Sequence, residues 1–137
     1  MMCGFVLAVE CFPCVPGSVA RARRRAAEAY AAYPLVDAFA VGLLVSEAAT
    51  NAVVHAASGG DFYVLCHAPA SGTVQIEVHD GGRGAPVRRC AAGLDEHGRG
   101  LELLDLLAAG WRTEPTAHGK SLIFTLGEGP HLARELP

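Results

Sequence analysis

The hydrophobic positions alternate at the start of the chain and then change to helical spacing. Apolar side chains alternate from Phe5 to Cys11, which predicts a first strand that ends before Pro13. Residues 21–32 are predicted to form a helix, with Ser18 as its N-cap and Pro34 beyond its end. A longer apolar stretch over residues 37–57 predicts a second helix, closed by the serine and glycines that follow it.

The second half of the chain is dominated by strand and turn patterns. Two strands are predicted over residues 62–68 and 73–78, a helix over 101–109, and a final hairpin from strands 111–113 and 121–126. Because strands and helices are mixed without strict alternation, we expect an α+β fold. This is a two-layer sandwich of a mostly antiparallel sheet with helices on one face. The 137 residues suit one domain over 1–137, with a loose tail over 127–137.

The amino-acid composition and net charge exclude some classes of protein. The hydrophobic content of 51% suits a folded domain, and a net charge of −3 lacks the basic excess typical of nucleic-acid binders. No apolar run of membrane-spanning length and no secretory signal is recognised, so we expect a cytoplasmic protein without a membrane partner. The five cysteines include one CxxC pair, Cys11 and Cys14, without a second pair. Reduced thiols are favoured, with a metal or redox role as the alternative.

The second predicted helix carries the first candidate chemistry. Glu47, Asn51 and His55 are spaced by four residues and therefore lie along one stripe of that helix. The amide oxygen of Asn51 suits magnesium, and Glu47 can orient or deprotonate a hydroxyl or water. A solvated face or a satisfied buried pair explains the same spacing, and His55 either orients Glu47 or only packs.

Two glycine-rich segments follow. Asp80 begins the segment DGGRG, where glycine lets the backbone approach a ligand and aspartate can accept a hydrogen bond from an exocyclic amine such as that of adenine. The segment GRG at 98–100 precedes a predicted helix, whose N-terminal amides, helped by Arg99, suit phosphate. An ordinary turn and a glycine hinge are the competing interpretations.

Taken in order, these motifs resemble the superfamily of gyrase, histidine-kinase and MutL-type ATPases over about residues 5 to 126. Glu47 and Asn51 match its N box, DGGRG matches its D-x-G-x-G box, and GRG matches its second glycine box. The resemblance implies a Bergerat ATP-binding fold with ATP and Mg²⁺ as cofactors, adenine on Asp80, magnesium on Asn51, and Glu47 as catalytic residue. The candidate nucleotide-binding residues are Asn51, Asp80, Gly82, Gly84, Gly98, Arg99, Gly100 and Ser121.

Within the superfamily the chain is most similar to small anti-sigma factor serine/threonine kinases and stand-alone ATP-binding regulators of actinobacteria. That similarity implies transfer of phosphate from ATP to a small antagonist protein and sequestration of a sigma factor. A non-catalytic ATP-binding switch module is the alternative. Lys120 stands where the family has threonine, which leaves one nucleotide contact open, with Ser121 as a substitute. The length argues against a histidine kinase or gyrase.

A cluster of arginines is the candidate surface for a protein partner. Four arginines fall within positions 21–25, and helical geometry groups Arg21, Arg24 and Arg25 while Arg23 points away. A solvated helix face is the ordinary interpretation. In the resembled family, arginines of the first helix contact protein partners. The exposed first strand and the family also suggest a homodimer.

Overall fold

The computed structural model of the protein describes residues 5–55, 60–81, 107–117 and 119–127. Its helices and strands follow one another in the order β1 (Val6–Pro13), α1 (Gly17–Ala29), α2 (Ala38–His55), β2 (Asp61–His67), β3 (Thr73–Asp80), β4 (Gly110–Thr116) and β5 (Gly119–Gly127). The two predicted helices and the five predicted strands within the described residues are therefore confirmed. Most of the predicted helix 101–109 and the tail beyond residue 127 lie outside the described residues.

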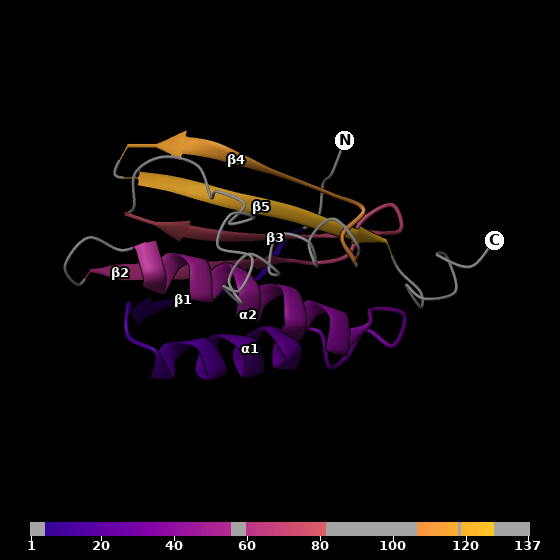
Figure 1. Cartoon of the computed structure of the whole chain (residues 1–137). Helices are drawn as coiled ribbons and strands as arrows, with labels where there is room; N and C mark the ends of the chain where they lie inside the picture. Colours follow the sequence, from indigo (N-terminus) through magenta and orange to yellow (C-terminus); the bar gives the residue numbers. More distant parts are fainter. Residues whose placement is uncertain (1–4, 56–59, 82–106, 118, 128–137) are drawn as a thin grey trace.

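The five strands form one sheet in the order β1-β2-β3-β5-β4, and every neighbouring pair is antiparallel. Both helices lie on the same face of this sheet (Figure 1). Side chains alternate between the two faces of a strand, so one set faces the helices and the other faces outward. The α+β two-layer architecture expected from the sequence is confirmed.

The core lies between the helices and the sheet. Its inward strand positions come mainly from β2, β3 and β5, and the largest fully buried side chains include Phe62, Ile76, Phe124 and Leu126. Helix α2 contributes Val41, Leu44 and Val45 from its sheet-facing side. By length and composition alone α2 could cross a membrane, but half of it is buried inside the fold, as in the core helix of a soluble domain.

Strand β1 forms where the sequence predicts it, and the structure shows which of its faces is covered. The alternating apolar side chains that predicted the strand include Val9 and Cys11, yet both are exposed, and β1 buries Ala8 and Phe12 instead. A register irregularity between Val6 and Ala8 changes the pairing with β2 at the start of the strand. The strand was predicted at the right place, and its covered face carries Ala8 and Phe12.

The first helix is not capped by the residue that the sequence suggested. Helix α1 begins at Gly17 with Pro16 at the N-cap and no side-chain cap, so Ser18 is not the capping residue. The hydroxyl of Ser18 is buried in the first turn and accepts a hydrogen bond from Arg21 Nη2 at 2.9 Å. At α2, Asp37 takes the capping role, because its Oδ1 accepts a hydrogen bond from the Ala40 amide at 3.1 Å.

Candidate functional site

Strand β3 ends with an acidic side chain on the helix-covered face. Val74, Ile76 and Val78 are buried there, and alternation puts Asp80 on the same side. In the β3–β5 register Asp80 lies opposite Lys120. The Lys120 ammonium donates a hydrogen bond to Asp80 Oδ1 over 3.2 Å, and the two side chains are only 8% and 7% exposed. The predicted base-binding aspartate is thus half of a buried ion pair.

Glycine is required at the residue before Lys120. A Cβ placed on Gly119 would lie 2.6 Å from the Cα of Gly81 and would collide with the backbone carbonyl of Asp80. The end of β3 and the start of β5 therefore approach each other more closely than a side chain allows. This approach fixes the backbone that carries both charges.

Ser121 does not share a face with Asp80. It lies opposite His79 in the register, one residue along β5 from Lys120, so its side chain points to the other side of the sheet. Ser121 is 2% exposed in that position. The suggestion that Ser121 replaces the family's threonine beside Asp80 does not fit this arrangement, because Lys120 occupies that place.

Helix α2 carries Glu47, Asn51 and His55 along one stripe, as their spacing predicts. All three side chains are partly buried, whereas the adjoining Ala48 and Ala52 face the core. Glu47 also lines a groove between α1 and α2 with a volume of about 570 Å³. Its side chain is therefore accessible from the helix surface as well as lying one turn from Asn51.

The remaining candidate phosphate-binding residues lie outside the described residues. These are Gly82, Gly84, Gly98, Arg99 and Gly100. The described part of the site consists of the α2 stripe, the end of β3 and the start of β5. Of its members, the structure brings Asp80 and Lys120 into direct contact.

Comparison with known families agrees with this architecture. A family model described as the histidine kinase-like ATPase domain matches residues 12–126. The chain belongs to the histidine kinase-like ATPase family. The match begins at the end of β1 and spans both helices, β2, β3, β4 and nearly all of β5. A search of curated proteins gave no significant match.

Membership of this ATPase family implies that the protein binds ATP. The chemistry of the described residues fits such a ligand. A buried carboxylate at Asp80 can accept a hydrogen bond from an exocyclic amine, and the Asn51 amide oxygen is a hard ligand of the kind that magnesium takes. The fold and the family are thereby established, while the individual contacts to nucleotide remain predictions.

The arginines of α1 divide differently from their predicted grouping. Arg25 Nε donates to Glu10 Oε1 of β1 at 3.0 Å, so this side chain is held at the sheet edge. Arg23 Nη1 donates to Ser46 of α2 at 3.3 Å, and Arg23 and Arg24 both line the groove beside Glu47. Arg23 therefore belongs with Arg24. The reason is that α1 buries Ala22 and Ala26, which sets the rotation of the helix.

The outer face of the sheet holds a polar cluster that sequence reasoning missed. Glu77 of β3 accepts hydrogen bonds from His67 Nε2 at 2.7 Å and His79 Nε2 at 2.8 Å. Burial raises the pKa of Glu77, but the hydrogen bonds from His79 and His67 outweigh it and hold the pKa below its ordinary value. The signal was available, because period-two spacing puts Glu77 and His79 on one face.

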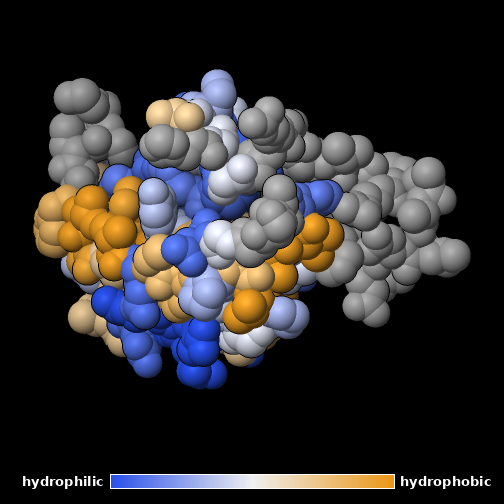
Figure 2. Space-filling model, turned by 90° about the vertical axis from the view of Figure 1, so that its left-hand side faces the viewer, coloured by the Kyte–Doolittle hydropathy of each residue, from blue (hydrophilic) through white to orange (hydrophobic). Residues whose placement is uncertain are grey.

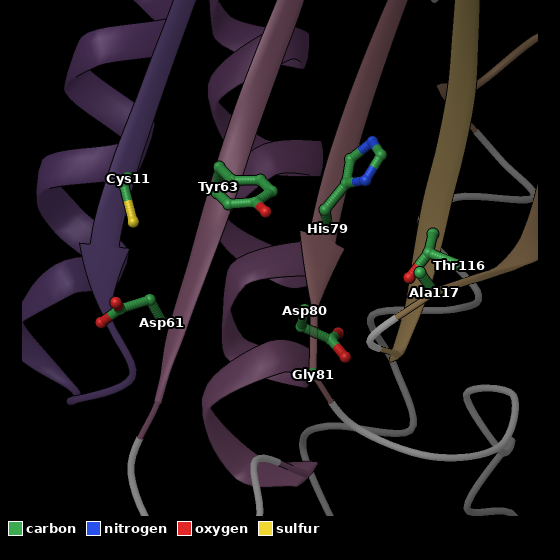
Figure 3. Close-up of a pocket in the computed structure, with 8 residues that line it drawn as sticks. All are labelled: Cys11, Asp61, Tyr63, His79, Asp80, Gly81, Thr116 and Ala117. Carbon is green, nitrogen blue, oxygen red and sulfur yellow. The ribbon is translucent and has the colours of Figure 1, made fainter.

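Beside this cluster lies a cavity of about 400 Å³ at one end of the sheet, lined by residues of β1, β2, β3 and β4 (Figure 3). It is lined by Cys11, Asp61, Tyr63, His79, Asp80, Gly81, Thr116 and Ala117. The rings of Tyr63 and His79 lie tilted against each other, with centroids 5.7 Å apart and an interplanar angle of 41°. In the part of the chain that the structure describes, no group of three or more histidine, cysteine or acidic side chains is arranged to hold a metal ion, and Cys11 and Cys14 are free thiols.

Proposed function

We propose that this protein is an ATP-dependent serine/threonine kinase that phosphorylates a small antagonist protein and sequesters a sigma factor in the cytoplasm. The coarse part of this function, ATP binding, follows from the family. The finer part is supported by one observation, which is the position of Glu47 between the α2 stripe and the surface groove.

The groove has the chemistry of a protein-docking surface. Phe39 is 78% exposed at its rim, and Arg23 and Arg24 supply positive charge. In Figure 2 the most hydrophilic surface gathers at the bottom of the molecule, over α1. An apolar anchor with basic neighbours suits an acidic protein segment. Because Glu47 lines the same groove, a hydroxyl on a docked protein can reach it without entering the core.

The proposed reaction needs one base and one acceptor. Glu47 takes the proton of a serine or threonine hydroxyl on the antagonist as that oxygen bonds to the γ-phosphorus. The bond from this phosphorus to the bridging oxygen breaks, and ADP leaves with the electron pair. Magnesium would supply charge neutralisation at the phosphates, and Asn51 is the described residue suited to hold it.

The test separates a kinase from a non-catalytic switch. Glu47→Gln should retain ATP binding and lose transfer of labelled γ-phosphate to the purified antagonist, because the amide cannot accept the hydroxyl proton. Glu28→Gln, an exposed change on α1, is the matched control. If the wild-type protein binds its partner in an ATP-dependent manner and transfers no phosphate, the switch module is the correct assignment.

A homodimer through the edge of the sheet completes the proposal. Strand β1 is an edge strand; Val6 and Val9 on it, and Phe5 just before it, are all more than 40% exposed. An exposed apolar edge favours pairing with another chain. Val9→Lys should shift the sedimentation equilibrium toward monomer, whereas an unchanged molecular mass would exclude β1 from the interface.

A further inference from the structure

The cavity at the end of the sheet opens on the outer face, on the side opposite to the helices. Its volume of about 400 Å³ lies within the range of roughly 300–1,000 Å³ that is typical of small-molecule sites. In Figure 3 the sheet is seen from this outer face, with the helices behind it. Cys11, Tyr63 and His79 lie side by side in the register of β1, β2 and β3. Because Val64 and Val78 are buried on the helix side, alternation puts Tyr63 and His79 on the outer side.

Two rings form the middle of this cavity. Tyr63 is 45% exposed, so the surface of its ring is available to a ligand. The ring is tilted against that of His79, and Glu77 holds His79 in this position through a contact of 2.8 Å between Oε1 and the imidazole Nε2. Glu77 also offsets the charge of the imidazole when it is protonated. A flat ligand group can therefore stack on rings that are in place before it binds.

The lining of the cavity carries negative charge. Asp61 is an exposed carboxylate two residues before Tyr63, on the same face of β2. Among the described residues that line the cavity, none is a lysine or an arginine. Partial burial, followed by the charge of Asp61, raises the pKa of the Cys11 thiol above 9.0, so this group is neutral at neutral pH. Asp80 is paired with Lys120, which leaves Asp61 as the charge that a ligand meets.

We propose that this cavity binds a small organic cation of the arylalkylamine class. The ammonium group lies near the Asp61 carboxylate, and the aromatic group lies over Tyr63 and His79. Thr116, on the β4 side of the cavity, supplies a hydroxyl for a polar group of the ligand. An anionic ligand is disfavoured, because it would meet the charge of Asp61 without a lysine or arginine from the described lining. The inference goes beyond the proposed function and requires neither ATP nor a protein partner.

Three ligands that share an indole ring separate the effect of charge from that of stacking. Tryptamine is a cation at neutral pH, tryptophol is neutral, and indole-3-acetate is an anion. Each is titrated into the whole chain without nucleotide, and amide NMR shifts report both the affinity and the position of binding. We expect saturable shifts with tryptamine at the amides of Tyr63 and His79. Tryptophol should bind about threefold to tenfold more weakly, and indole-3-acetate more weakly still.

Two substitutions test the side chains assigned to the site. Asp61→Asn keeps the shape of the side chain and removes its charge. Tryptamine should then bind about threefold to tenfold more weakly and lose its advantage over tryptophol. Tyr63→Leu should weaken all three ligands, because it removes a ring on which they stack. Glu28→Gln, an exposed change on α1, is the matched control and should leave the three affinities unchanged.

Measurements on the wild type alone can overturn the inference, even if the variants do not fold. Equal affinities for tryptamine and tryptophol would show that the charge of Asp61 does not select the ligand. Shifts confined to residues outside the cavity, or the absence of any saturable shift, would exclude the site itself. Because no nucleotide is present, these results would leave the proposed ATP-dependent function untouched.

Discussion

Removing one charge of the Asp80–Lys120 pair should cost far more stability than removing both. Asp80→Asn preserves the shape of the side chain and leaves the Lys120 ammonium buried without its counter-ion. Breaking a buried pair in this way costs about 3–5 kcal/mol, whereas replacing both partners is often close to neutral. Since a domain of this size is stable by about 5–15 kcal/mol, the single variant loses a large share of its stability.

Urea unfolding of the four proteins in a double-mutant cycle measures this coupling. With a slope of about 2 kcal/mol per molar urea, the midpoint of Asp80→Asn should fall by roughly 1.5–2.5 M. Lys120→Met should fall by a similar amount, and the double variant should recover most of the loss. Losses that add within about 0.5 kcal/mol would show that the two charges are independent and refute the reasoning. The cycle also measures how much stability Asp80→Asn loses, so that a loss of ATP affinity in this variant can be separated from a loss of folded protein.

Three further results are expected. Gly119→Ala should lower the free energy of unfolding by about 1–3 kcal/mol and weaken ATP binding in calorimetry, because its Cβ would lie 2.6 Å from Gly81 Cα. Gly110→Ala is the control, because its Cβ would lie 3.8 Å from the nearest side chain, and it should change neither quantity. The hydrogen bonds that depress the pKa of Glu77 stabilise the fold fully above its ordinary value of 4.5 and are lost as pH falls through the lower folded value. Acid unfolding of Glu77→Gln should therefore depend less on pH below about 4.5, and an unchanged profile would contradict this. Arg24→Glu should slow association with the partner, with a larger effect at low salt. Arg25→Glu should have a smaller effect because Arg25 is paired with Glu10. Equal effects of the two variants in surface-plasmon binding would indicate that neither arginine belongs to a specific docking surface.

The sequence pattern predicted the positions of the helices and strands well, but it was less informative about which face of each one is buried. Period-two spacing and turn residues located β2, β3 and the final hairpin to within a few residues. In β1, apolar residues occupy both faces, so alternation alone cannot decide which face the helices cover. The packing of Phe12 against Phe62, with ring centroids 5.4 Å apart, made that choice. Such contacts depend on partners distant in the chain.

The arginines of α1 show the same limit. Helical spacing correctly gives the angles between Arg21, Arg23, Arg24 and Arg25, but it does not say which direction faces a neighbouring helix. The close approach of α1 to α2 at Gly42, where an added Cβ would lie 3.1 Å from Arg23 Cγ, draws Arg23 into the groove. A glycine in the middle of the second helix was the available signal for this contact.

The Asp80–Lys120 pair follows from the sequence once strand register is known, and register was the missing quantity. Motif matching placed a threonine position at residue 120 and allowed its neighbour Ser121 to substitute for it. In a strand, however, a shift of one residue moves a side chain to the opposite face. With Asp80 paired to Lys120 and His79 paired to Ser121, the serine cannot reach the face on which Asp80 lies. A substitution at a single inward position therefore changes the charge beside Asp80 that a nucleotide bound there would meet, and a hydroxyl on the next residue does not compensate for it.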